Sequence, residues 1–79
     1  MNSPDPAIAN YLNGNLRDAC NQARRVKSIV LYQALRARFR KTEDQALAIV
    51  RYLKTPTAET WQAACLAELS ETPYTAPRV

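Results

Sequence analysis

Glycine occurs only once in this chain of 79 residues, at Gly14, and the five prolines stand at positions 4, 6, 56, 73 and 77. Because glycine and proline most often interrupt regular structure, the stretches between these positions are free to form long helices. Those stretches are rich in Ala, Leu, Arg and Gln, which favour helix, and they lack the alternation and turn pairs typical of strands. The sequence therefore predicts an all-α fold.

The length of the chain limits it to one domain. We expect a small helical bundle of three main helices plus a short N-terminal helix, formed by residues 1–71, and a flexible C-terminal tail over residues 72–79. A chain this short buries only roughly 60–65% of its unfolded surface, so its stability margin is thin. A homodimer would widen that margin, and dimerisation stays open on this ground.

Capping residues place the ends of the predicted helices. The first helix begins near Ser3 or Asp5 and ends at the Asn-Gly-Asn stretch around Gly14. Nothing interrupts the next run, so one helix is predicted from Leu16 to about Arg40, with a kink near Lys27–Ser28 as an allowed variation. The third starts at Thr42, whose spacing to Gln45 is that of a capping box, and the last starts at Thr55 or Thr57.

The predicted 16–40 helix carries apolar side chains on two sides. One side is mostly alanine, and the other is bulky. A helix of this kind is usually covered on both sides, either by helices of its own chain or by a second protein. The bulky side is thus either intrachain core or a dimer or partner interface, and it consists of Leu31, Tyr32, Leu35 and Phe39.

The residues that catalysis and metal binding require are scarce. The chain has no histidine, and its two cysteines, Cys20 and Cys65, lack the spacing of a metal site. We interpret both cysteines as small buried side chains in a reducing compartment. Glu43 and Asp44 are adjacent and point about 100° apart on a helix, so they do not converge as a catalytic pair. We therefore expect no catalytic residue, no metal, no cofactor and no small-molecule substrate.

The apolar runs are far shorter than the roughly 20 residues that a membrane span needs. The N-terminal segment also lacks the basic and apolar regions of a signal peptide. We therefore expect a cytoplasmic protein with no membrane association.

Positive charge is concentrated in the middle of the chain. Residues 16–54 contain ten Lys or Arg against three Asp or Glu, a net charge of +7, whereas the flanking residues sum to −3. Eight of the eleven basic residues are arginine, which suits bidentate contact with phosphate. The basic region is either a surface that binds nucleic acid or a solvated face partly neutralised by the acidic last helix.

The helical period selects the contact residues within this region. On an unbroken helix Arg36 and Arg40 share a face, with Arg25 two to three turns earlier, while Arg38 points nearly the opposite way. Helices 42–54 and 55–71 make a poor helix-turn-helix, because the second would carry acids and no base. We therefore expect a binder of the DNA or RNA backbone rather than a sequence-specific protein. The predicted contact residues are Arg25, Arg36, Arg40 and Lys41.

The alternative function is a protein–protein adaptor or inhibitor, a homodimeric module of the accessory or antitoxin-like kind, without nucleic-acid binding. It would use the bulky stripe of Leu31, Tyr32, Leu35 and Phe39 as its interface.

Overall fold

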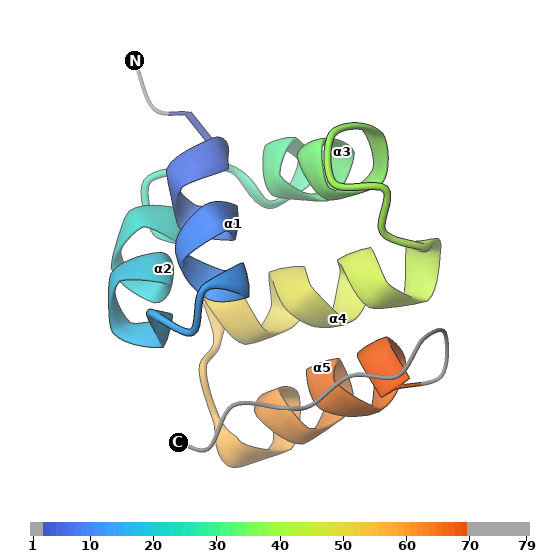
Figure 1. Ribbon diagram of the computed structural model, residues 1–79. Helices are drawn as coiled ribbons and strands as arrows, with labels where there is room; N and C mark the ends of the chain where they lie inside the picture. Colours follow the sequence, from blue (N-terminus) through green and yellow to red (C-terminus); the bar gives the residue numbers. More distant parts are fainter. Residues whose placement is uncertain (1–2, 70–79) are drawn as a thin grey trace.

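The computed structural model describes residues 3–69, and this range contains no strand. The expected all-α class is confirmed, and the predicted tail over residues 72–79 lies outside the described range. None of the helices in this range combines the length and the apolar character needed to cross a bilayer. The described chain forms five α-helices, drawn in Figure 1: α1 (Asp5–Leu12), α2 (Leu16–Ala23), α3 (Ser28–Ala37), α4 (Glu43–Lys54) and α5 (Ala58–Leu69).

The single helix predicted from Leu16 to about Arg40 is wrong. It is divided into α2 and α3 by a four-residue turn, Arg24–Lys27, which we call the α2–α3 turn. The backbone tightens there, because the amides of Arg25 and Val26 donate to carbonyls only three residues earlier. Lys27 is then extended, with φ −66° and ψ 145°. The second helix therefore leaves the turn in a new direction (Figure 1).

A lysine from a distant helix donates to backbone carbonyls at the point where the helix is interrupted. The ammonium group of Lys54, at the end of α4, donates to the carbonyl of Ala23 at 2.7 Å and to the carbonyl of Val26. These carbonyls belong to the end of α2 and to the turn, where a helix leaves acceptors without partners and where positive charge is favoured. The side chain of Val26 is buried at the same place. Contacts across 28 to 31 residues thus supply the end of α2 with a charged donor that a continuous helix would not use.

α1 and α2 pack against each other as a helical hairpin, and α4 contacts α2, α3 and α5 (Figure 1). Gly14 makes the hairpin turn with φ +85°, the left-handed conformation expected of it. In Figure 1, α4 crosses the middle of the molecule between α3 and α5.

The core lies where these helices meet. Its largest fully buried side chains are Ile8, Leu31, Leu35, Ile49 and Leu53. Beside them, three aromatic rings from α1, α4 and α5 make an edge-packed group, with centroid separations of 5.3 to 6.4 Å. These rings are Tyr11, Tyr52 and Trp61, and the partly buried Trp61 packs against the core.

Two helix starts follow the sequence expectations. The Gln45 amide donates to Thr42 Oγ1 at 3.2 Å, and the Thr42 amide donates to Gln45 Oε1 at 3.0 Å, which is the capping box expected for α4. At the start of α5, Thr57 takes the capping position, because its Oγ1 accepts from the Thr60 amide at 3.2 Å. Of the two expected starts for this helix, the structure thus has the later one.

The role of Lys54 can be tested by replacing it with methionine, which keeps the length of the side chain and removes the charge. Lys54→Met leaves two carbonyls without their charged donor, so we expect the free energy of unfolding to fall by about 1–3 kcal/mol. Arg51→Met, on the exposed side of the same helix, is the matched control and should change stability by less than about 0.5 kcal/mol. Urea denaturation followed by circular dichroism measures both. Equal losses in the two variants would contradict the assignment.

Candidate nucleic-acid interface

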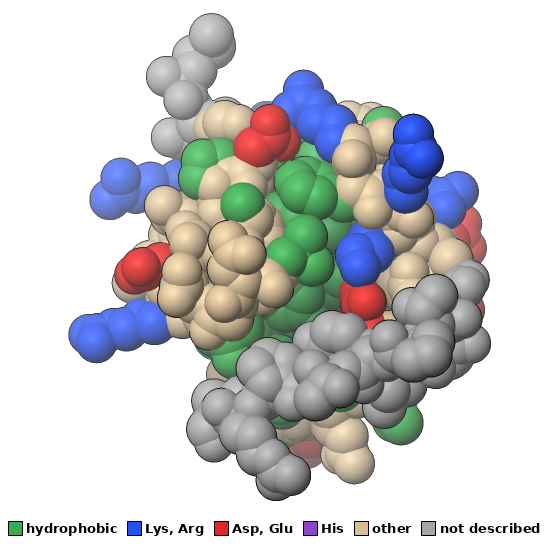
Figure 2. Space-filling model, viewed as in Figure 1, with side chains coloured by type: hydrophobic (Ala, Val, Ile, Leu, Met, Phe, Trp, Pro, Cys, Tyr) green, Lys and Arg blue, Asp and Glu red, His purple; other side chains and the backbone are tan. Residues whose placement is uncertain are grey.

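The basic side chains of the middle region gather at the two ends of α3. Arg24, Arg25 and Lys27 precede the helix in the α2–α3 turn, and all three are exposed. At the other end stands the α3–α4 corner, which we define as residues 36–41. In the view of Figure 2, hydrophobic surface occupies the middle of the face, and most Lys and Arg side chains lie around it. The corner contains Arg36, Arg38, Arg40 and Lys41.

The four predicted contact residues do not form one line on a helix. Arg25 lies in the turn before α3, Arg36 lies in the last turn of α3, and Arg40 lies beyond its end. The expected alignment is therefore corrected, and the reason is the break between α2 and α3. Arg25 and Arg40 now flank α3 from opposite ends. With a rise of about 1.5 Å per residue, a ten-residue helix separates its ends by about 15 Å.

Lys41 is committed to a contact inside the chain. Its Nζ lies 3.0 Å from Glu68 Oε2, and the two side chains are only 18% and 5% exposed. This pair joins the α3–α4 corner to α5. It also neutralises part of the basic region with the acidic last helix, as the solvated-face alternative expected. Lys41 therefore stabilises the α3–α4 corner as an internal brace, and little of its side chain is accessible to a partner.

Arg36 and Arg38 are exposed, and each bonds to one other residue among residues 3–69. Arg36 Nη1 donates to the Lys41 carbonyl at 3.2 Å, so the side chain folds over the corner and keeps its other N–H groups available. Arg38 Nη1 lies 2.8 Å from both carboxylate oxygens of Asp5, at the start of α1. With side-chain exposures of 61% and 48%, this ion pair contributes less than about 1 kcal/mol.

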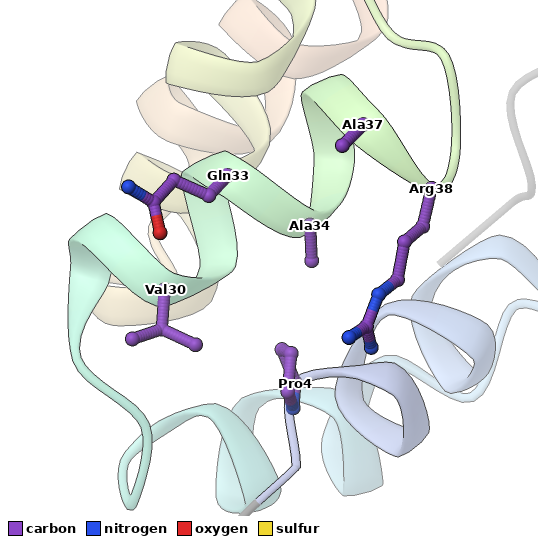
Figure 3. A pocket seen from close by; sticks show the side chains of 6 residues that line it. All are labelled: Pro4, Val30, Gln33, Ala34, Ala37 and Arg38. Atoms are coloured by element: carbon purple, nitrogen blue, oxygen red, sulfur yellow. The ribbon is translucent and has the colours of Figure 1, made fainter.

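The ion pair borders a shallow hollow between α1 and α3. Figure 3 shows Val30 and Ala34 projecting from α3 toward Pro4, with Arg38 reaching across from the end of the helix. Gln33 lies at the rim of this hollow, apart from Pro4. Arg38 thus closes one side of the hollow, and Gln33 belongs to the outer side of α3.

Arg40 has an unusual backbone conformation. Its φ is +55°, the one positive value among the described residues other than glycine. The left-handed region costs a side chain with a Cβ about 1 kcal/mol or more relative to glycine. Directly after it, the Lys41 amide donates to the Leu35 carbonyl at 2.9 Å and closes the end of α3. The Arg40 side chain is exposed and makes no hydrogen bond or ion pair within residues 3–69.

The outer face of α3 contains residues that the sequence expectations missed. Ile29 is 56% exposed, and Gln33 and Arg36 follow it at the spacing of one helix face. Once α3 is known to begin at Ser28, the spacing 29, 33, 36 identifies this row. On an unbroken helix from Leu16 to Arg40, the same row would not stand out from the other exposed positions.

The expected interface stripe divides into core and partly covered residues. Leu31 and Leu35 have no exposed surface in the single chain, so the expectation of an interface at these two side chains is corrected. They face α4 and the rest of the core because α3 turns its other side outward. Tyr32 and Phe39 are half-buried and pack against the same core. The intrachain alternative therefore accounts for this stripe.

The two thiols are held in their protonated form. Burial raises the pKa of Cys20, and the hydrogen bond from Tyr52 and the charge of Arg24 offset this only in part. Burial, followed by the negative charge of Glu68, raises the pKa of Cys65. Because the thiolate is the nucleophile, both cysteines are poorly reactive at neutral pH.

This reactivity gives a pH-dependent prediction. A raised pKa means that the thiolate forms only at higher pH, so near pH 8 each native thiol should react with a disulfide reagent more slowly than the same thiol in denaturant, whose pKa is about 8.5. Cys20→Ser and Cys65→Ser variants follow each thiol alone. A native rate equal to the denatured rate would contradict the protonated assignment.

The strain at Arg40 gives a second prediction. Arg40→Gly and Arg40→Ala both remove the side chain, but only glycine adopts the left-handed conformation without a steric cost. We expect the glycine variant to be more stable than the alanine variant by about 1 kcal/mol. Thermal or urea unfolding compares them. An alanine variant as stable as the glycine variant would show that the backbone at Arg40 is relaxed.

The site thus consists of exposed cations at both ends of α3 and an exposed row of Ile29, Gln33 and Arg36 between them, held on a helix whose opposite side is buried. No family model, curated protein or solved structure matches the chain.

Proposed function

We propose that this protein is a non-enzymatic binding module whose partner is nucleic acid, contacted through the two ends of α3. The observation that carries the proposal is that three cationic side chains at the ends of α3 are exposed and unpaired in the described range. Arg24 and Lys27 before the helix, and Arg40 after it, are exposed and make no side-chain hydrogen bond or ion pair within residues 3–69. Such side chains are available to phosphates, which would release their counterions on binding.

The conformation of Arg40 supports the proposal independently. Glycine would suit this backbone better, and the arginine side chain makes no hydrogen bond or ion pair within the described chain that would offset the steric cost. Strained residues of this kind are concentrated at sites of function. An arginine that the fold does not need is consistent with a contact to a partner.

The roles within the predicted set are revised accordingly. Arg25, Arg36 and Arg40 remain proposed contact residues, and Arg24 and Lys27 join them. Lys41 becomes the internal brace that positions Arg40, through its ion pair with Glu68. The proposed compartment is the cytoplasm, where nucleic acid is present and two free thiols stay reduced.

The salt dependence of binding tests this function. We expect a fluorescently labelled duplex of random sequence to bind at low salt and to dissociate steeply as salt rises, with a log–log slope of about −0.9 per phosphate neutralised. Fluorescence anisotropy over a salt series measures the slope. Absence of binding at low salt would overturn the proposal.

Substitutions then locate the contact. Arg40→Gln should reduce the magnitude of the slope by about 0.9, because one phosphate contact is lost. Arg17→Gln is the matched control, since Arg17 is also an exposed and unbonded arginine in the described chain but lies at the far end of α2 from the turn. The Arg40→Gly variant should bind the duplex as weakly as the Arg40→Gln variant, although we expect the glycine variant to be the more stable protein. Equal losses from Arg40→Gln and Arg17→Gln would mean that net charge alone attracts the duplex.

A further inference from the structure

We infer that α3 enters the major groove of duplex DNA and contacts base edges with Ile29, Gln33 and Arg36. This inference rests on the proposed function and gives it a ligand class: a double-stranded DNA site of definite sequence. It also departs from the backbone binder expected from sequence.

The connection between α2 and α3 has the length of the turn that precedes such a helix. Four residues, Arg24–Lys27, join an eight-residue helix to a ten-residue helix that runs in another direction (Figure 1). DNA-binding helix-turn-helix units use a turn of three to four residues, and the second helix is the one that enters the groove. Here α1 and α4 support the pair from the other side, because α1 packs on α2 and α4 packs on both α2 and α3.

The two sides of α3 differ as a groove-binding helix requires. Its inner side is formed by Leu31, Ala34 and Leu35, each at most 6% exposed. Its outer side carries Ile29, Gln33 and Arg36 and no acid. The packed inner side fixes the rotation of the helix, so the outer row is presented in a defined direction.

The outer row has the chemistry of base recognition. A glutamine amide can bond to adenine N6 and N7, and an arginine can bond to guanine O6 and N7. An exposed isoleucine can contact a thymine methyl group, and in this row it has no partner in the core. Arg36 Nη1 donates one hydrogen bond to the Lys41 carbonyl, which limits the motion of the Arg36 side chain. The remaining N–H donors of its guanidinium group are left for a base.

The spacing of the flanking cations fits the groove. The ends of α3 are about 15 Å apart, and the major groove is about 12 Å wide. Lys27 at one end and Arg40 at the other can therefore meet phosphates on the two sides of the groove while the outer row faces the bases. Glu43 and Asp44 are the acids nearest to Arg40 in sequence, and they belong to the first turn of α4, where they compensate its dipole.

The experiment selects preferred sites from a library of random DNA duplexes with the full chain, and then measures affinities by anisotropy. We expect an enriched motif that binds more tightly than random duplex. Gln33→Ala should lower affinity for that motif by about tenfold or more, with little change for random duplex. Gln62→Ala, an exposed glutamine on α5, is the matched control. Both positions are exposed, so circular dichroism should show unchanged folding.

A duplex RNA of the same sequence is the second arm. Its deep, narrow major groove does not admit a helix, so it should bind no better than random DNA. Salt-dependent binding with no enriched motif, equal effects of Gln33→Ala and Gln62→Ala, or preference for RNA would overturn the groove assignment and leave the proposed function standing. Absence of any binding to DNA or RNA at low salt would overturn both.

Discussion

The bond from Lys54 to the end of α2 ties the last residue of α4 to the turn that redirects the chain. Within the turn the Val26 amide already donates to the Ala23 carbonyl at 3.1 Å, and the Lys54 ammonium group adds a charged donor to that carbonyl and to the carbonyl of Val26. With the donor in place, α3 is free to turn away from α2 and to lie on α4. The turn also moves Arg25 to the opposite end of α3 from Arg40. The break between α2 and α3 therefore sets both the packing of α3 and the distribution of positive charge, and the Lys54 ammonium group bonds to the turn at that break.

Local signals in the sequence were sufficient where the structure is itself local. The Thr42–Gln45 capping box, the left-handed Gly14 and the Thr57 cap each involve residues within a few positions of one another, and each could be predicted. The sequence allows a kink near Lys27–Ser28, but no local signal selects the full break between α2 and α3. It contains neither glycine nor proline, and its partner lies 28 to 31 residues later in the chain.

The same limit explains the errors in the site. The predicted alignment of Arg25, Arg36 and Arg40 applies the helical period across the break between α2 and α3. Because the helix is broken there, Arg25 does not share a face with the other two. The sequence does not distinguish Lys41 from the other basic residues, because its ion pair is with Glu68 of α5, far along the chain. Leu31 and Leu35 were correctly identified as a bulky stripe, but the choice between core and interface needed the position of α4. Periodicity gives the side of a helix, and only packing decides what covers that side.

The division of α3 into a buried side and an outer side has a consequence for how this protein can diverge. Substitutions at Leu31 or Leu35 change the core and should be removed by selection for folding, whereas Ile29 and Gln33 face outward and carry little of the stability. The outer row can therefore vary among descendants of this chain while the scaffold stays constant. Among related chains, the positions that differ most on α3 would then be those that set the choice of partner.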